Sequence, residues 1–278
     1  MENVIQQIDP ANPINWRSNL NSSLLVRLIA GKNQSALQAK GFGQRPQIWV
    51  QNGSPAIGSN FGRPGGIASF NFNGTDAWFQ PSVLSSYLTG SAPGKFSMLM
   101  WVRCTENVNA NYSFYGSFGN FFGIHSNLLA MQNGAQAFRV SSYTVPTNKW
   151  EHYAACYDGA VLNFYVNGVF NSSVSYTGGN LPGNDGNPFN SPSIGASDGN
   201  VLYKGQLDDI ALFGRCLGEG EVAAWRDDSL QGGIETLNFL PSTVYFSVKV
   251  QHGHGPPASK KGFARSPILA SRQIVGVN

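Results

Sequence analysis

Short runs of apolar or alternating residues, each bounded by glycine, asparagine or proline, follow one another along most of this 278-residue chain. GIASFNF (66–72) alternates between two sets of side chains, which is the period of a β-strand. KFSMLMWVRC (95–104) is apolar at nearly every position, as in a strand buried on both faces. VLNFYVNGVF (161–170) places Asn167-Gly168, the signal of a type I′ turn, between two strand-like runs. Many short strands joined by tight turns predict an all-β sandwich or barrel.

The composition agrees with this class, because 33 glycines and 12% aromatic residues suit tight turns between packed strands. One helix is expected at 218–228, with Val222 and Trp225 facing a core and glutamates in its first turn. Gly, Asn and Pro are frequent in 31–65 and 171–192, which we expect to be irregular connections. Further strands are expected at 23–30, 47–50, 77–80, 112–118, 121–125, 128–132, 136–141, 149–158 and 203–214.

Several segments, taken in order, resemble the laminin-G-like/concanavalin-A-like superfamily, in the branch of LamG jelly rolls found in bacterial and phage proteins. The segments are ASFNFNGTDAWFQ (68–80), KFSMLMWVR (95–103) with Trp101, NKWEHYAACYDGAVLNFYVNGV (148–169), and SIGASDG (193–199) followed by YKGQLDDIALFGRCLGEGEVAAW (203–225). The resemblance implies a two-sheet antiparallel jelly-roll sandwich with one short helix. We expect this domain over 24–241, with the match concentrated in 66–229, an N-terminal arm at 1–23, and a C-terminal strand and basic extended arm at 242–278.

The positive charge is concentrated in the C-terminal arm, whereas the chain as a whole carries only +3. The arm holds no acidic residue, so it either contacts an acidic neighbour or acts as a solubilising tail. No pattern of interleaved basic and aromatic residues accompanies these charges, and we do not expect nucleic-acid binding. The basic residues of the arm are Lys249, Lys260, Lys261, Arg265 and Arg272.

Three widely spaced cysteines, Cys104, Cys156 and Cys216, indicate neither a disulfide framework nor a zinc site. The N-terminal residues lack the basic and then apolar pattern of a signal peptide. No stretch approaches the roughly 18 apolar residues of a membrane span. We therefore expect a protein without a signal peptide or membrane segment, folded in a cytoplasm.

The pattern of carboxylates argues against catalysis. Sugar-cleaving members of the superfamily carry a Glu-x-Asp-x-x-Glu run on one strand, and this chain has none. His152 lies inside a predicted strand, and the resemblance implies that it is a packed structural residue. We therefore predict a protein that is not an enzyme.

Many members of the superfamily hold a structural calcium ion with an Asp side chain and backbone carbonyls. By position, the resemblance makes Asp208, Asp209, Asn73 and Asp76 the candidate ligands. The alternative is that Asp208 caps local backbone and that residues 73–76 only form a turn.

Aromatic residues are dense between 112 and 122, and alternate ones face outward if this segment is a pair of strands. Tyr112, Phe114, Tyr115 and Phe118 are therefore candidates to contact a sugar or a partner. The alternative is that they fill the core or a subunit contact.

Two functions follow from these features. The first is a structural assembly protein, a virion component that decorates or cements a capsid or builds a tail or fibre. It would bind neighbouring subunits, including copies of itself, through its arms, and it would assemble in the host cytoplasm. The alternative is a carbohydrate-binding module, with or without calcium.

Overall fold

In the computed structural model, the chain divides into two units, residues 1–238 and 239–278, and every described residue lies in the first. The predicted strand at 243–251 and both predicted arms, apart from Ser23, lie outside the described residues. The described ranges are 23–30, 38–40, 48–53, 56–58, 62–66, 68–81, 94–106, 111–117, 120–132, 138–176, 193–197 and 201–230.

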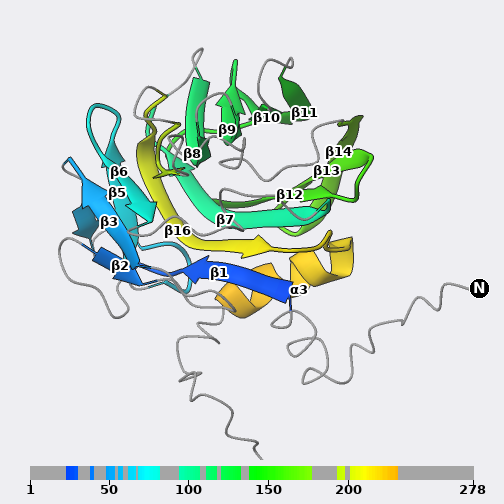
Figure 1. The fold of residues 1–278 in the computed structure, drawn as a ribbon, viewed down its shortest axis with the longest axis horizontal. Coiled ribbons are helices and arrows are strands. Elements are labelled where there is room, and N and C mark those ends of the chain that lie inside the picture. Colours follow the sequence, from blue (N-terminus) through cyan, green and yellow to red (C-terminus); the bar gives the residue numbers. More distant parts are fainter. Residues whose placement is uncertain are drawn as a thin grey trace, which may run out of the picture. The chain divides into compact units, whose positions relative to one another are not determined.

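Two antiparallel sheets pack face to face as a sandwich, which confirms the predicted fold class (Figure 1). Sheet A has the order β14 (Val169–Ser175), β13 (Val161–Val166), β12 (Glu151–Tyr157), β7 (Phe96–Cys104), β16 (Lys204–Phe213), β5 (Ser69–Asn73) and β4 (Ala56–Gly58), with β1 (Leu24–Leu28) also paired to β16. Sheet B has the order β11 (Arg139–Thr144), β10 (Leu128–Gln132), β9 (Asn120–His125), β8 (Asn111–Ser117), β15 (Ser193–Ile194), β6 (Trp78–Pro81), β3 (Ile48–Asn52) and β2 (Gln38–Lys40).

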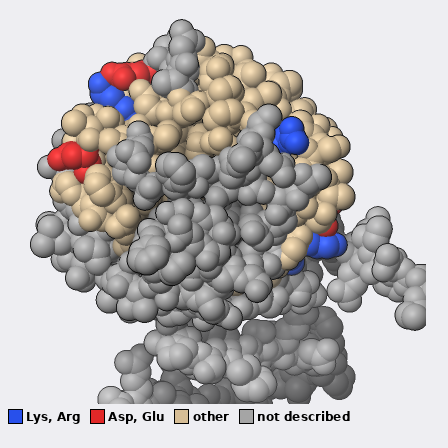
Figure 2. All heavy atoms as spheres, turned by 45° about the horizontal axis from the view of Figure 1, so that its top comes forward, with Lys and Arg blue, Asp and Glu red and all other residues tan. Residues whose placement is uncertain are grey.

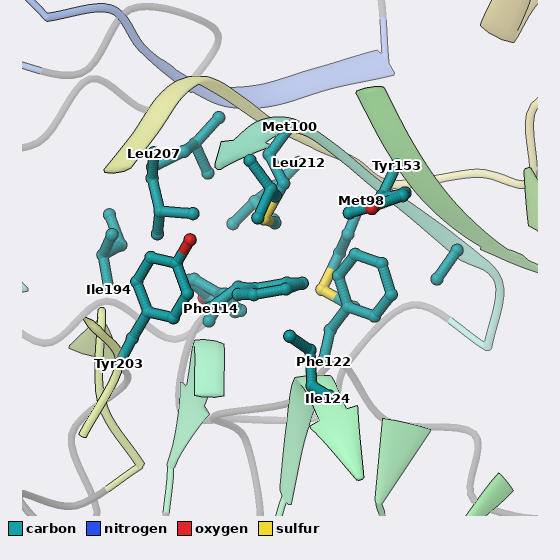
Figure 3. Packing of buried hydrophobic residues seen from close by; sticks show 14 of the residues in the cluster. Met98, Met100, Phe114, Phe122, Ile124, Tyr153, Ile194, Tyr203, Leu207 and Leu212 are labelled. Atoms are coloured by element: carbon teal, nitrogen blue, oxygen red, sulfur yellow. The ribbon is translucent and has the colours of Figure 1, made fainter. Parts of the chain in front are cut away.

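The main core lies between the two sheets. Figure 3 shows Met98 and Met100 of sheet A pointing toward Phe114, Phe122 and Ile124 of sheet B. All five side chains are buried. The strand β7 is apolar at almost every position because it is covered on both faces, as its sequence predicts.

A second, smaller core lies on the other face of sheet A, beneath helix α3 (Glu219–Leu230) (Figure 1). Trp225 of α3 packs edge-on against Phe213, with ring centroids 5.1 Å apart. Glu221 accepts a hydrogen bond from the backbone N–H of Gly218 at 3.1 Å, which is one half of a capping box and fixes where α3 begins. Among the described residues, no helix is long and apolar enough to cross a bilayer.

The central strand β16 changes its partner halfway along its length. Residues 204–207 pair with β5, and residues 210–213 pair with β1. Between these two stretches, a β-bulge interrupts the pairing with β7, and Asp209 adopts a φ of 47°. Since a bulge inserts an extra residue, the side chains of Asp208 and Asp209 face the same side of the sheet instead of alternating. Two adjacent carboxylates therefore lie on the face that α3 covers.

The hairpin of β13 and β14 confirms the predicted turn, because Asn167 and Gly168 both have positive φ, at 51° and 81°. The prediction of a loop from residue 171 is wrong up to Ser175, since 171–175 belong to β14. This strand is polar because it forms the exposed edge of sheet A. A bulge at Asn171 and a hydrogen bond from the Phe170 N–H to Glu219 at 2.9 Å protect that edge from pairing with another chain.

Most of the other predicted elements are confirmed within one to three residues at their ends. Three short strands were not predicted. They are β2 and β4, which lie in the expected irregular connection 31–65, and β15. Each has only two or three residues, too few to show a period of two in the sequence.

Candidate functional site

One exposed end of the sandwich brings together polar side chains from four separate parts of the chain. We call Asn73, Asp76, Glu106, Tyr112 and Lys204 the end cluster. Asn73 ends β5 and lies directly opposite Lys204, the first residue of β16. Glu106 follows β7, and Tyr112 is the second residue of β8. The antiparallel order of β5, β16 and β7 is what brings the ends of these strands to one edge.

The turn between β5 and β6 is held by the side chain of Asn73. Its Oδ1 accepts hydrogen bonds from the backbone N–H groups of Thr75, at 2.8 Å, and Asp76, at 3.1 Å. Its Nδ2 donates to Oδ1 of Asp76 at 2.6 Å. Gly74 has a φ of +75°, and a Cβ there would lie 2.9 Å from the Cβ of Lys204. The Asn-Gly pair is therefore needed for this turn to fit against β16.

Glu106 links the other two members of the cluster. Its carboxylate accepts a hydrogen bond from the ammonium of Lys204 and another from the hydroxyl of Tyr112 at 3.3 Å. The hydrogen bond from Lys204 lowers the pKa of Glu106, and the same bond raises the pKa of Lys204. Burial raises the pKa of Tyr112. The cluster therefore presents a carboxylate, an ammonium group and a neutral phenol near neutral pH.

The side chains of Glu106 and Lys204 are 45% and 42% exposed, so both retain atoms that a ligand can reach. Tyr112 is fixed by an edge-to-face contact with Tyr203, with ring centroids 6.2 Å apart. Such a set of donors and acceptors beside an aromatic ring suits the recognition of a ligand with several hydroxyl groups. No group of three or more His, Cys, Asp or Glu suited to a metal ion occurs among the described residues.

The four predicted calcium ligands do not form one site. Asn73 and Asp76 belong to the end cluster, where Asn73 pairs with Lys204. Asp208 lies four residues beyond Lys204 along β16, about 13 Å away at the rise of a strand. Both Asp208 and Asp209 are fully buried. The assignment of these two residues as calcium ligands is therefore wrong.

The carboxylates of Asp208 and Asp209 pair with arginines instead. We define the ion-pair cluster as Arg27, Arg63, Asp208, Asp209 and Ser229. Arg27 of β1 contacts the two oxygens of Asp209 at 2.5 and 2.7 Å. Arg63 contacts Asp208 at 2.8 Å, and the hydroxyl of Ser229 in α3 donates to Asp209. The other oxygen of Asp208 accepts the backbone N–H of Ala30 at 2.8 Å. The ion-pair cluster ties β1, residues 62–66 and α3 to the bulge in β16.

Burial affects the two carboxyl groups differently. It raises the pKa of Asp208 to about 7, although the charge of Arg63 opposes the shift. It would also raise the pKa of Asp209, but the charge and hydrogen bonds of Arg27 bring that pKa below its usual value. Both groups are sealed from solvent, so this ion-pair cluster holds the fold together rather than meeting a ligand.

The predicted aromatic contact surface is wrong for two of its four residues. Phe114 and Tyr115 are 0% and 1% exposed and belong to the core between the sheets. A bulge between Ser113 and Tyr115 breaks the alternation, so two neighbouring residues both face inward. Tyr112 is half-buried in the end cluster, and Phe118 lies outside the described residues. The five basic residues of the predicted assembly arm also lie outside them.

His152 is fully buried and packs edge-on against Trp101, as the resemblance implied. Sequence reasoning missed Glu106 and Lys204. Both lie at or just beyond the ends of predicted strands (95–104 and 203–214), but only the pairing of these strands brings them beside the turn at Asn73. Figure 2 shows that charged side chains are few and scattered over the described part of one face, without a broad area of one sign.

The two packed antiparallel sheets, with one helix over the outer face of sheet A, define a jelly-roll sandwich. A family model described as the concanavalin A-like lectin/glucanases superfamily (Laminin_G_3) matches residues 72–223. The chain therefore belongs to this superfamily. A search of curated proteins finds no match.

Solved structures with the same fold include bacterial toxin domains and a sugar-binding domain. The binding domain of Paraclostridial Mosquitocidal Protein 1 is 15% identical with a TM-score of 0.57, over 75% of this chain and 53% of that one. Botulinum neurotoxin type C, which interacts with two ganglioside molecules, is 14% identical with a TM-score of 0.58, over 77% and 53%. Domain 4 of the arabinanase AbnA from Geobacillus stearothermophilus, in complex with arabinotriose, is 18% identical with a TM-score of 0.52, over 72% and 97%. This chain spans about half the length of the toxin structures.

Proposed function

We propose that this chain is a non-enzymatic binding module that recognises a glycan at the end cluster. The observation that carries this proposal is the exposed set of Glu106, Lys204 and Tyr112 beside the turn at Asn73 and Asp76. Sugar hydroxyls bind to carboxylates, amides and ammonium groups that strands hold in place, and an adjacent tyrosine edge adds apolar contact. The similar structures include one with arabinotriose and one that interacts with gangliosides, which supports a glycan as the ligand.

The carboxyl groups support binding rather than sugar cleavage. A general acid for glycoside hydrolysis needs a raised pKa and contact with the substrate. Glu106 is accessible, but Lys204 lowers its pKa. Asp208 has a raised pKa, but it is 0% exposed and paired with Arg63. Neither residue combines the two properties that the acid needs.

The proposal is tested by a glycan array followed by calorimetry with the best ligand. We expect Glu106→Gln to weaken binding about tenfold, because a hydrogen bond to a charged group is stronger than one to a neutral amide. Asp158→Asn is the matched control, since Asp158 is also an exposed carboxylate with a lowered pKa. It follows β12 beside the start of β7, whereas Glu106 follows the end of β7. If no glycan binds, or if the two variants bind equally well, the end cluster is not a glycan site.

Calcium binding is a separate proposal. With Asp208 and Asp209 paired to arginines, it concerns only the other two predicted ligands, Asn73 and Asp76. The array repeated with EDTA tests it. Loss of glycan binding with EDTA, and its recovery with added calcium, would support a calcium-dependent site. Unchanged binding would restrict the proposal to direct contacts with the end cluster.

A second candidate function is virion assembly, and the charge of residues 242–278 favours it. This segment carries five basic residues and no acidic one, as expected of an arm that contacts an acidic neighbouring subunit. Particles from the native source, separated on a density gradient, provide the test. Full-length protein should sediment with large particles, and protein lacking residues 252–278 should not. Sedimentation of the full chain as a small free species would contradict an assembly role.

A further inference from the structure

Three Asn-Gly pairs lie in the part of the chain that the structure describes, at 52–53, 73–74 and 167–168. We propose that Asn73 is a self-modification site. Its side-chain amide reacts with the backbone nitrogen of Gly74 to form a cyclic imide, which water then opens to aspartate or isoaspartate. Asn-Gly is the sequence in which this attack is least hindered, because glycine has no side chain beside its nitrogen.

The reaction needs no reagent other than water. The nitrogen of Gly74 forms a bond to Cγ of Asn73, and the bond from Cγ to Nδ2 breaks. Nδ2 leaves as ammonia, taking up the proton that the Gly74 nitrogen gives up. Water then adds across one of the two C–N bonds of the imide, so a carboxyl group and an N–H are formed. The net change is one amide plus water giving one carboxylic acid plus ammonia, with no oxidation or reduction.

The turn fixes the amide of Asn73 through its oxygen. The hydrogen bond from Thr75 N–H to Oδ1, at 2.8 Å, closes a ring that contains both Cγ of Asn73 and the nitrogen of Gly74. Asp76 N–H donates to the same oxygen at 3.1 Å. Two donors on a carbonyl oxygen stabilise the negative charge that forms there when a nucleophile adds, as an oxyanion hole does.

Asp76 also contacts the leaving group. Its Oδ1 lies 2.6 Å from Nδ2 of Asn73, and the side chain of Asn73 is exposed to water. We infer that this carboxylate relays to the departing nitrogen the proton that the Gly74 nitrogen releases, which is general acid–base catalysis. The turn thus supplies an activated carbonyl, a proton carrier and access for water.

The backbones and side chains of the other two pairs are held differently. Oδ1 of Asn167 accepts the N–H of His152 at 3.0 Å, and its Nδ2 donates to Glu151 at 3.4 Å, a longer contact than that between Asn73 and Asp76. Gly168 is buried against Ala223 of α3, whereas Asn73 is exposed to water. Asn52 lies within the ladder between β3 and β6, opposite Trp78, which holds its backbone extended. We therefore expect both of them to react more slowly than Asn73.

The product changes the charge of the end cluster. A carboxylate at position 73 would lie beside the carboxylate of Asp76, in place of the amide that now donates to it. It would also stand opposite Lys204 in the ladder. Repulsion between the two carboxylates would open the turn. This inference rests on the geometry of the turn alone and does not depend on glycan binding.

The test follows the full-length protein during incubation at pH 8, with peptide mass spectrometry of each Asn-Gly site and water labelled with ¹⁸O. We expect the peptide containing Asn73 to gain about 1 Da first, or about 3 Da in labelled water, with isoaspartate among its products. The Asp76→Asn variant should convert Asn73 about tenfold more slowly, which is less than the ~10²-fold effect of an optimised general acid. Asp158→Asn should match the wild type.

Two results would overturn the proposal. One is conversion of Asn73 no faster than that of Asn167 or Asn52 in the same sample. The other is an unchanged rate at Asn73 in Asp76→Asn, provided that its melting temperature matches that of the wild type. Hydroxylamine, which cleaves the chain at a cyclic imide, gives an independent readout, and cleavage after residue 73 is the expected product.

Discussion

Acidification should destabilise this fold through His152, whose ring is fully buried beside Trp101. Burial lowers the pKa of His152 from 6.5 to about 3. Neither ring nitrogen has a hydrogen-bond partner among the described residues. In the unfolded chain the same imidazole takes up a proton below about pH 6.5, so the unfolded state binds more protons than the folded state between these two values. Stability that is present above pH 6.5 is therefore lost as the pH falls toward 3.

The size of the effect follows from the two pKa values. A pH of 4.5 lies two units below the pKa of histidine in the unfolded chain and above its pKa in the folded protein. Protonation of the unfolded state therefore lowers the free energy of unfolding by about 3 kcal/mol relative to pH 7.5. Urea unfolding of the wild type and of His152→Phe at both pH values measures it. Phenylalanine fills a similar volume and does not titrate, so the variant should lose about 3 kcal/mol less than the wild type on acidification.

Subtraction of the variant from the wild type is needed because other carboxyl groups with lowered pKa values, such as Asp209, also make stability fall with acid. Equal pH dependence in the two proteins, within about 0.5 kcal/mol, would show that His152 is protonated in the folded state. That result would refute the claim that burial keeps His152 neutral in the folded protein.

Other predictions concern the two cores and the ion-pair cluster. Asp209→Asn should cost about 3–5 kcal/mol of unfolding free energy by urea titration, because Arg27 would be left buried without its partner; a cost below 1 kcal/mol would mean that solvent reaches Arg27. Trp225→Ala should cost about 3–5 kcal/mol and should increase hydrogen exchange in α3 before sheet B, whereas uniform exchange would contradict a separate second core. Phe114→Ala should destabilise by a similar amount and leave glycan affinity in the surviving folded protein unchanged, and a selective loss of affinity would restore Phe114 as a contact residue.

Local patterns in the sequence predicted the sandwich well, because its strands carry their own periodicity and turn residues. The run from 95 to 104 marks a doubly covered strand, and Asn167-Gly168 marks a hairpin. The extension of β14 to Ser175 was not predictable in this way. An edge strand exposed to water has the Ser and Asn content of a loop, and only its ladder with β13 identifies it.

The site was harder to predict because it depends on bulges and on partners far away in the sequence. Alternation would place Phe114 and Tyr115 on opposite faces, but one bulge turns both inward. The carboxylate of Asp209 is of the type that binds calcium, but it pairs with Arg27, which lies 182 positions earlier in the chain. No local pattern indicates such a pairing. The turn at Asn73 and Asp76 was predictable because its hydrogen bonds join residues only two or three positions apart.

The position of β16 at the centre of sheet A has a consequence for synthesis on the ribosome. This strand bonds to β1, β5 and β7, which are made more than 90 residues earlier. Until residues 204–213 emerge, β7 lacks one of its two neighbours, and the Asp208 and Asp209 that pair with Arg63 and Arg27 do not yet exist. Folding dominated by such distant contacts is slow, and incomplete sheets expose strand edges that aggregate. The nascent chain should therefore depend on holding chaperones until most of its length has been translated.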